Sequence, residues 1–350
     1  MNNKIIAEDL EFIVSHNLPW ESFKNSTVLI TGANGYLPAY MLETLLYLND
    51  KYNAKIHVLA LTRNKKRSFE RFNYYKGRKD LEFLFQDVCD PLNIKKGRQL
   101  NYIIHAASQS NHEYYKTDPI GTLSANTIGT INLLKKARKE SCKGFLYLST
   151  GGVYGRVEDK NIPIKEDDYG YLDPTEVEAC YNESKRMGEN ICVCWNYQYG
   201  IPTKVVRISY VYGPGMNLND RRVFPAFIAN IVKGRDIVMT SNGSDTRAFC
   251  YIADATVAFF TVLLMGKNAE VYNVGIEKET SVKELADLLT RSFPEKGLKV
   301  VKRQADKSRV DNKMRIHRSL FDISKIKALG WAPVFDLSQG CKRTVLSYGE

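Results

Sequence analysis

The stretch TVLITGANGYLP, residues 27–38, decides the fold of this chain. Its first five residues read as a buried strand, which runs straight into a turn with two glycines. The letters that follow, AYMLETLLYL, have the apolar spacing of a helix. Glycines at a strand-to-helix turn let the backbone approach a pyrophosphate, which then lies on the positive end of the helix dipole. We therefore interpret the stretch as a phosphate-binding turn rather than a plain turn, with contacts from Gly32, Asn34, Gly35, Tyr36 and Leu37.

Pro38 stands where such turns carry a third glycine. Proline is tolerated in the first turn of a helix, because the N–H group that it lacks would have no partner there. The phosphate site is therefore expected to survive, whereas the packing of the helix against the strand is expected to differ.

Around this turn, apolar strand-like runs alternate with longer segments of helical period. The runs lie at residues 27–31, 56–62, 81–88, 102–107, 145–149 and 204–208. Strands that are apolar on both faces and alternate with helices are typical of a parallel sheet covered by helices on both sides. The sequence therefore predicts an α/β fold of the doubly wound Rossmann type.

Three segments are expected along the chain. Residues 1–25 read as an N-terminal helical extension, and residues 26–208 hold the alternating pattern of a dinucleotide-binding Rossmann domain. Beyond residue 208 the elements become shorter, and turn signals such as the Gly-Pro-Gly at 213–215 appear. Residues 209–350 are therefore expected to form a smaller α/β C-terminal substrate lobe, interleaved with the first domain.

Composition narrows the functional classes. With 44% hydrophobic and 25% charged residues over 350 positions, the chain is typical of a globular protein, not of a disordered or fibrous one. No run approaches the roughly 20 apolar residues of a membrane span, and the first residues are too acidic for a secretory signal. The seven cysteines form no CxxC pair, which is typical of reduced core thiols. We expect a cytoplasmic protein with no membrane partner.

The net charge of +11, from 50 Lys and Arg against 39 Asp and Glu, favours an anionic partner. The basic residues are dispersed, so nucleic acid is not predicted as that partner. Their densest cluster, residues 63–67, directly follows the second strand-like run. The five histidines, at positions 16, 57, 105, 112 and 317, are widely separated, and no catalytic metal is predicted. His105 lies in an apolar run, which is typical of a core histidine.

The end of the second strand distinguishes the two nicotinamide dinucleotides. A carboxylate there binds the ribose hydroxyls of NAD, whereas a neutral residue followed by arginine accommodates the 2′-phosphate of NADP. This chain has Thr62 and Arg63 and no acid. We predict NADP as the preferred cofactor, with NAD as the alternative. At the end of the third run, Asp87 and Val88 are placed to contact the adenine, although a lone Asp after a strand is also typical of a turn or a helix cap.

The letters YNESK at residues 181–185 lie in a segment of helical period, so their spacing places Tyr181 and Lys185 on one helical face. A nearby ammonium stabilises phenolate, and Lys185 is therefore predicted to lower the pKa of Tyr181 into a useful acid–base range. Upstream, the run LST at 148–150 ends a strand beside two glycines. Thr150 is the predicted participant, at the sheet edge where doubly wound folds bind ligands.

Together these residues resemble the extended short-chain dehydrogenase/reductases of the NAD-dependent epimerase/dehydratase family, which modify nucleotide sugars. The matches run in order: TGANGYL at 31–37, HAAS at 105–108, Asn126 in NTIGT, LST before GGVYG, YNESK, RISYVYGPG at 207–215 and RAFCYIAD at 247–254. The resemblance implies an enzyme, expected as a homodimer, that exchanges a hydride between NAD(P) and a secondary alcohol of the sugar, usually at C4.

The resemblance also implies roles for individual residues. Tyr181 and Lys185 correspond to the catalytic pair, and Thr150 to the hydroxyl that hydrogen-bonds the reacting sugar oxygen. Asn126 corresponds to the residue that supports the active-site helix beside the cofactor. Further contacts are implied at Ala106 and Ala107 for the cofactor, and at Tyr210, Val223 and Arg247 for the nucleotide sugar.

Within this family the chain looks most like the UDP-glucuronate decarboxylases, but two departures bear on the reaction. Decarboxylases and 4,6-dehydratases carry an acid directly before Val-Tyr-Gly, where this chain has Gly152, and the family's substrate-binding asparagine is replaced by Tyr210. Glu176 and Glu178, in the loop before the catalytic tyrosine, read as solvated charges. We therefore expect an epimerase, with an NADPH-dependent reductase of a keto-sugar as the alternative. A dehydratase, a decarboxylase or a non-catalytic dinucleotide sensor is less favoured.

Overall fold

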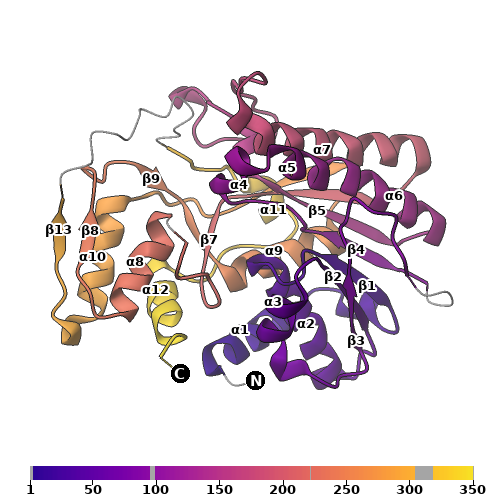
Figure 1. The fold of residues 1–350 in the computed structure, drawn as a ribbon, viewed down its shortest axis with the longest axis horizontal. Helices are drawn as coiled ribbons and strands as arrows, with labels where there is room; N and C mark the ends of the chain where they lie inside the picture. Colours follow the sequence, from indigo (N-terminus) through magenta and orange to yellow (C-terminus); the bar gives the residue numbers. More distant parts are fainter. Residues whose placement is uncertain (1–2, 95–98, 221, 304–317, 350) are drawn as a thin grey trace.

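The computed structural model describes residues 3–94, 99–220, 222–303 and 318–349. Among these residues, seven parallel strands form one sheet in the order β11-β6-β5-β4-β1-β2-β3, with helices on both faces (Figure 1). The strands are β1 (Thr27–Thr31), β2 (His57–Thr62), β3 (Leu81–Phe85), β4 (Tyr102–His105), β5 (Gly144–Thr150), β6 (Thr203–Ile208) and β11 (Glu270–Val274). The predicted doubly wound Rossmann sheet is confirmed.

The order of the strands reverses between β1 and β4. From β1 the chain adds β2 and then β3 on one side, whereas β4, β5 and β6 extend the sheet on the other. In open α/β sheets, ligands bind outside the carboxyl ends of the strands at such a switch point. The turn after β1 and the ends of β4 and β5 therefore define where a site is expected.

Two layers of helices cover the sheet. One layer contains α1 (Lys4–Ser15), α2 (Tyr36–Tyr52) and α9 (Ile252–Met265), and the other contains α5 (Pro119–Asn126), α6 (Ile128–Glu140) and α7 (Cys180–Tyr199). The helix α7 ends at Gly200, whose φ of 68° is the left-handed conformation that glycine adopts without strain. Because α7 packs on β5 and β6, it brings its first turns to the carboxyl ends of these strands.

A second, smaller group of elements lies beside the sheet, at the left of Figure 1. It pairs β7 (Tyr210–Tyr212) with β10 (Phe249–Tyr251), β9 (Thr246–Arg247) with β12 (Thr280–Ser281), and β8 (Ile237–Met239) with β13 (Val300–Lys302). Its helices are α8 (Val223–Val232), α10 (Val282–Ser292) and α12 (Leu337–Leu346). The chain returns from this group to add β11 to the main sheet, so the two parts are interleaved. The boundary at residue 208 stays a prediction.

The remaining elements are short. They are the helices α3 (Lys65–Arg71), α4 (His112–Thr117) and α11 (Ser324–Lys327), and the 3₁₀ helices η1 (Trp20–Phe23), η2 (Asn73–Tyr75), η3 (Gly151–Tyr154), η4 (Asp159–Asn161), η5 (Val177–Ala179) and η6 (Pro294–Lys296). Two of them matter for the site: η3 follows β5 directly, and η5 directly precedes α7.

The N-terminal helix α1 is tied to both parts of the molecule by one buried carboxylate. Asp9 is fully buried and accepts hydrogen bonds from the hydroxyls of Tyr40 in α2, at 3.0 Å, and Tyr251 in β10, at 2.8 Å. The guanidinium of Arg343 in α12 donates to it at 2.7 Å. Because α2 begins at the glycine turn and β10 pairs with β7, Asp9 joins the phosphate side of the molecule to the smaller lobe.

All seven cysteines are free thiols. Five of them are buried, as predicted for core residues, whereas Cys89 is partly buried and Cys194 is exposed. In the part of the chain that the structure describes, no helix combines the length and the apolar character that a membrane crossing requires.

Candidate active site

The glycine turn after β1 is held against the end of β4. Gly32 has a φ of +64°, and a Cβ atom there would lie 2.8 Å from the Cα atom of Ala107. The backbone N–H groups of Ala106 and Ala107 donate to the Thr31 hydroxyl at 3.1 and 3.0 Å, so β4 ends at His105 instead of reaching residue 107 as predicted. Only glycine satisfies both the left-handed backbone and this close approach.

His105 contacts the same turn from the interior of the protein. One ring nitrogen contacts the Thr31 hydroxyl at 2.9 Å and the other contacts the Thr130 hydroxyl at 3.1 Å. Burial lowers its pKa to about 3, so the imidazole is neutral. His105 is therefore a core histidine with both nitrogens satisfied, as the sequence predicted. Of the other histidines, His317 lies outside the described residues.

The other predicted phosphate contacts lie at the start of α2. Gly35 is the N-cap, and Tyr36 and Leu37 are the first two residues of the helix, both partly buried. The Asn34 amide donates to the Ser68 hydroxyl at 3.2 Å and so ties the turn to α3.

Arg63 and Asp87, predicted at the adenosine end, form an ion pair with an N–O distance of 3.2 Å. The third strand does not reach Val88 as predicted: β3 ends at Phe85, because the Asp87 carboxylate accepts the N–H of Cys89 at 2.8 Å and turns the chain. Val88 is buried, and its side chain packs against the backbone of Gly129 in α6. Asp87 is thus both a turn residue and a partner of the predicted phosphate-binding arginine.

Tyr181 and Thr150 meet at the carboxyl end of β5. Tyr181 lies in the first turn of α7, within hydrogen-bonding reach of the hydroxyl of Thr150, the last residue of β5. The ring of Tyr115 from α4 stacks on Tyr181, with centroids 5.1 Å apart and planes 13° apart. Burial raises the pKa of Tyr181, while the Thr150 hydroxyl and the charge of Arg222 act in the opposite direction.

Lys185 is buried one turn further along α7. Its ammonium donates to the Leu148 carbonyl oxygen at 2.6 Å and lies 4.7 Å from the ring centroid of Tyr147. Burial lowers the pKa of Lys185 to about 7. The prediction that Lys185 lowers the pKa of Tyr181 is therefore wrong for this structure. The ammonium is turned toward β5, and the cation that favours the phenolate is Arg222.

Asn126 connects α5 with the active-site helix. Its amide donates to the Ser184 hydroxyl at 3.0 Å and to the Thr122 carbonyl at 3.2 Å. Ser184 in turn donates to the backbone oxygen of Tyr181 at 3.0 Å. This chain of contacts places Asn126 where it supports the first turn of α7, the position that the family resemblance implied.

The two glycines after Thr150 lie against neighbouring side chains, which would have to move if either position carried a side chain. A Cβ atom on Gly151 would lie 2.3 Å from the Phe321 ring, and one on Gly152 would lie 2.1 Å from the Asn182 amide oxygen. The place where relatives are expected to hold an acid is therefore filled by a neutral amide. Of the loop carboxylates, Glu178 pairs with Lys116 on α4 at 2.9 Å.

Tyr210 and Arg247, two of the predicted substrate contacts, lie together. The Arg247 guanidinium carbon is 5.2 Å from the Tyr210 ring centroid, and this ring is partly exposed. Val223, the third, is exposed at the start of α8. Its neighbour Arg222, which the sequence analysis missed, forms the N-cap of that helix and pairs with Asp220 at 2.6 Å. The sequence did contain one signal for Arg222, because it is a basic residue directly before Val223, a predicted substrate contact.

The sequence matches the model described as the NAD dependent epimerase/dehydratase family over residues 28–275. The chain belongs to this family. It is 33% identical to UDP-glucuronic acid decarboxylase 1 of Danio rerio over 320 residues, which cover 91% of this chain and 71% of that protein. It is 29% identical to a putative UDP-glucose 4-epimerase of Methanocaldococcus jannaschii over 320 residues, covering 91% of this chain and 97% of that protein.

The fold of this family member is also that of solved relatives. The crystal structure of UDP-glucose 4-epimerase from Thermotoga maritima superposes with a TM-score of 0.76 and 24% identity, over 92% of this chain and 98% of that one. Homologues in the family are NAD-dependent nucleotide-sugar epimerases, dehydratases and decarboxylases of the extended short-chain dehydrogenase/reductase type. The predicted family and the predicted enzyme class are confirmed.

A nicotinamide dinucleotide, as the family implies, fits the residues at the switch point. Gly32 has no Cβ atom that would cover the turn. Gly35 has no side chain that could block the N–H groups in the first turn of α2, a helix of 17 residues. The Arg63 side chain is 58% exposed. The buried hydroxyl of Tyr36 has no hydrogen-bond partner among the described residues.

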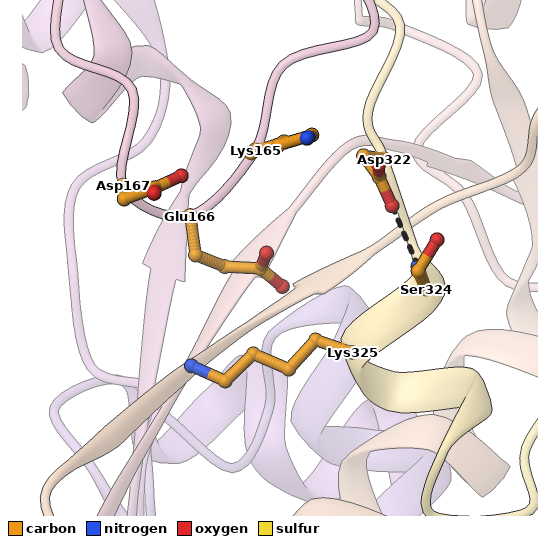
Figure 2. Close-up of a pocket in the computed structure, with 6 residues that line it drawn as sticks. All are labelled: Lys165, Glu166, Asp167, Asp322, Ser324 and Lys325. Carbon is orange, nitrogen blue, oxygen red and sulfur yellow. Dashed lines mark hydrogen bonds between the residues drawn. The ribbon is translucent and has the colours of Figure 1, made fainter.

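A cavity of about 480 Å³ lies apart from the predicted site residues of this family member. Figure 2 shows Lys165 and Lys325 reaching into it from opposite walls, with Glu166 between them. Its other lining residues are Asp167, Asp322 and Ser324, and the Asp322 carboxylate accepts the Ser324 N–H at 2.8 Å. The cavity holds charges of both signs and none of the catalytic hydroxyls, so we do not assign the reaction to it.

Proposed function

We propose that this enzyme is an NAD(P)-dependent nucleotide-sugar epimerase that inverts a secondary alcohol of the sugar at C4. The observation that carries the proposal is the arrangement around β5: Thr150 and Tyr181 meet there, while Asn182 and Phe321 fill the space beside Gly151 and Gly152. Thr150 and Tyr181 supply the hydrogen bond and the proton transfer that a hydride transfer needs from the protein. Gly152 has no side chain and its neighbour Asn182 is neutral, so this place offers no acid or base for an elimination.

The residues would divide the work as follows. When bound, the nicotinamide ring supplies the acceptor and donor of the hydride. Thr150 holds the reacting hydroxyl, and Tyr181 takes its proton as the C–H bond gives up a hydride, which leaves a ketone. The opposite step returns the proton from Tyr181 to the ketone oxygen, with hydride delivered to the other face of the carbon. Arg222 and the Thr150 hydroxyl stabilise the phenolate form between the two steps.

A reductase that receives a ketone from elsewhere would need the same residues. The observation that supports this second candidate is the exposed Arg63 side chain at the end of β2. An arginine there would favour NADPH, which is the reduced pool in most cells. Decarboxylation is favoured by a different observation, the Arg222 cation beside Tyr181, which could hold a sugar carboxylate. It conflicts with the filled space beside Gly152.

The experiment that tests the proposal is a panel of nucleotide hexoses, each incubated with the purified protein and either NAD or NADP, with products separated by chromatography. A C4 epimer formed without net consumption of cofactor is the expected result. Stoichiometric oxidation of NADPH with a keto-sugar would instead establish the reductase.

We infer that NADP is preferred over NAD. A charge-assisted contact between Arg63 and the 2′-phosphate is worth about 1.5–3 kcal/mol, or roughly 10- to 150-fold in affinity. Arg63→Ala should weaken NADP binding by this factor and change NAD binding little. Calorimetric titration of both cofactors checks this. The matched control is Lys135→Ala, which removes a positive charge from the exposed side of α6. Equal weakening for both cofactors would contradict the assignment.

We further infer a homodimer that contacts its second copy through α6 and α7. These helices expose several large apolar side chains, namely Ile128, Met187, Val193 and Tyr197. Exposed apolar side chains gathered on neighbouring helices are typical of protein interfaces. Because all seven cysteines are free thiols, we place the enzyme in a reducing compartment, the cytoplasm.

A further inference from the structure

A second buried ionisable residue follows the catalytic lysine by one turn of α7. Glu189 lies four residues after Lys185, and the two residues are 6% and 2% exposed. The Lys185 ammonium donates a hydrogen bond to the Leu148 carbonyl oxygen at 2.6 Å. Burial strongly disfavours an ammonium group, so a nearby counter-charge decides whether Lys185 keeps its proton.

The Glu189 carboxylate is fixed by side chains from two strands. The Arg207 guanidinium in β6 donates to it through Nη2 at 2.8 Å and through Nε at 3.1 and 3.2 Å. The Ser149 hydroxyl in β5 donates to it as well. Arg207 is held in turn by the Glu166 carbonyl oxygen at 2.8 Å. The position of the negative charge relative to Lys185 is therefore set by the sheet and not by side-chain rotation.

The groups that face Lys185 or its carboxylate neighbour are Glu189 and Cys192 from α7, His105 from β4, Tyr147 from β5 and Arg207 from β6. Three of them are neutral at physiological pH. Burial raises the pKa of the Cys192 thiol and of the Tyr147 hydroxyl, and lowers the pKa of His105 to about 3. Within the described part of the chain, Glu189 is thus the carboxylate that acts on Lys185.

We propose that Glu189 is a positioning residue whose carboxylate keeps the ammonium of Lys185, buried one helical turn after Tyr181, charged. The inference rests on the proposed function and adds to it the role that the family resemblance implies for Lys185 as the partner of Tyr181. Burial lowers the pKa of Lys185 to about 7 even with Glu189 in place. An opposite charge close to an ionisable group typically shifts its pKa by about 1–3 units, so without Glu189 the amine would be neutral at physiological pH.

The test compares the wild type with Glu189→Gln and with Ser149→Ala, which removes a hydrogen bond from Glu189 but no charge. The ¹³Cε signal of Lys185, assigned by its loss in Lys185→Met, is followed by NMR as the pH is varied. The midpoint of this titration should fall by about one unit or more in Glu189→Gln and stay unchanged in Ser149→Ala. The alkaline limb of kcat/KM should move to lower pH by the same amount, a roughly tenfold loss at pH 8 for each unit.

An unchanged Lys185 midpoint in a folded Glu189→Gln protein overturns the proposal. If this variant fails to fold because Arg207 is left buried and unpaired, the double variant E189Q/R207Q removes both charges. Because the double variant removes no net charge, it serves only to show that the fold survives without the pair. Arg207→Gln then gives the second test: it leaves the Glu189 carboxylate without its paired cation, so the Lys185 midpoint should rise, and a midpoint at the wild-type value again overturns the proposal. If the wild type converts no nucleotide sugar, the proposed function fails, while the Lys185 titration still decides the role of Glu189.

Discussion

Tyr181→Phe should lower turnover by about 10²–10⁴-fold, the usual contribution of a positioned general acid or base. The phenol is the group that meets Thr150 at the end of β5, and its removal deletes the path for the hydroxyl proton. The Phe ring keeps its packing against Tyr115. Cofactor affinity should therefore stay within about threefold, so that the loss lies in kcat and not in binding.

The matched control is Tyr115→Phe. This variant removes the other hydroxyl of the stacked pair, which donates to the Ser110 backbone oxygen at 3.2 Å. Steady-state kinetics should show a small effect for Tyr115→Phe, and cofactor titration should show tight binding for both variants. If Tyr181→Phe kept more than about a tenth of the wild-type rate, Tyr181 would not be the acid–base group.

Asp9→Ala should destabilise the protein by about 3–5 kcal/mol, because it leaves a buried guanidinium contact and two buried hydroxyls without their acceptor. These partners are Arg343, Tyr40 and Tyr251, which come from three different elements, α12, α2 and β10. Urea unfolding followed by circular dichroism measures the change in midpoint and slope.

Glu8→Ala provides the control for Asp9, since Glu8 also pairs with Arg343, at 2.9 Å, but is 44% exposed. An exposed pair is worth about 0–1 kcal/mol, so this variant should unfold near the wild-type midpoint. Equal effects of the two substitutions would show that burial of Asp9 does not matter and that α1 is not a structural clamp.

The strands of the Rossmann sheet could be predicted because their runs are apolar on both faces. The seventh strand, β11, could not: its letters EVYNV are half polar, and its first two residues are only partly buried at the edge of the sheet. Its place depends on pairing with β6, a contact between segments far apart in the sequence. The local pattern carries no signal for such a contact.

The residues of the candidate site could be predicted by type, but their mutual orientation could not. The spacing of Tyr181 and Lys185 correctly places both on α7, yet the Lys185 ammonium turns to the Leu148 carbonyl. The ammonium takes this orientation because Lys185 is buried against β5. In the same way, the sequence shows that Gly152 stands where relatives carry an acid. It does not show that the Asn182 amide occupies the space beside Gly152.

The central claim is that a hydride leaves and returns at C4 with no atom lost from the sugar. The most direct measurement uses a nucleotide hexose and the matching nucleotide hexuronate, each carrying deuterium at C4, with the products examined by mass spectrometry and NMR. We expect a C4 epimer of unchanged mass that retains deuterium at C4. A product lighter by water or by carbon dioxide, or loss of the deuterium to solvent, would contradict it.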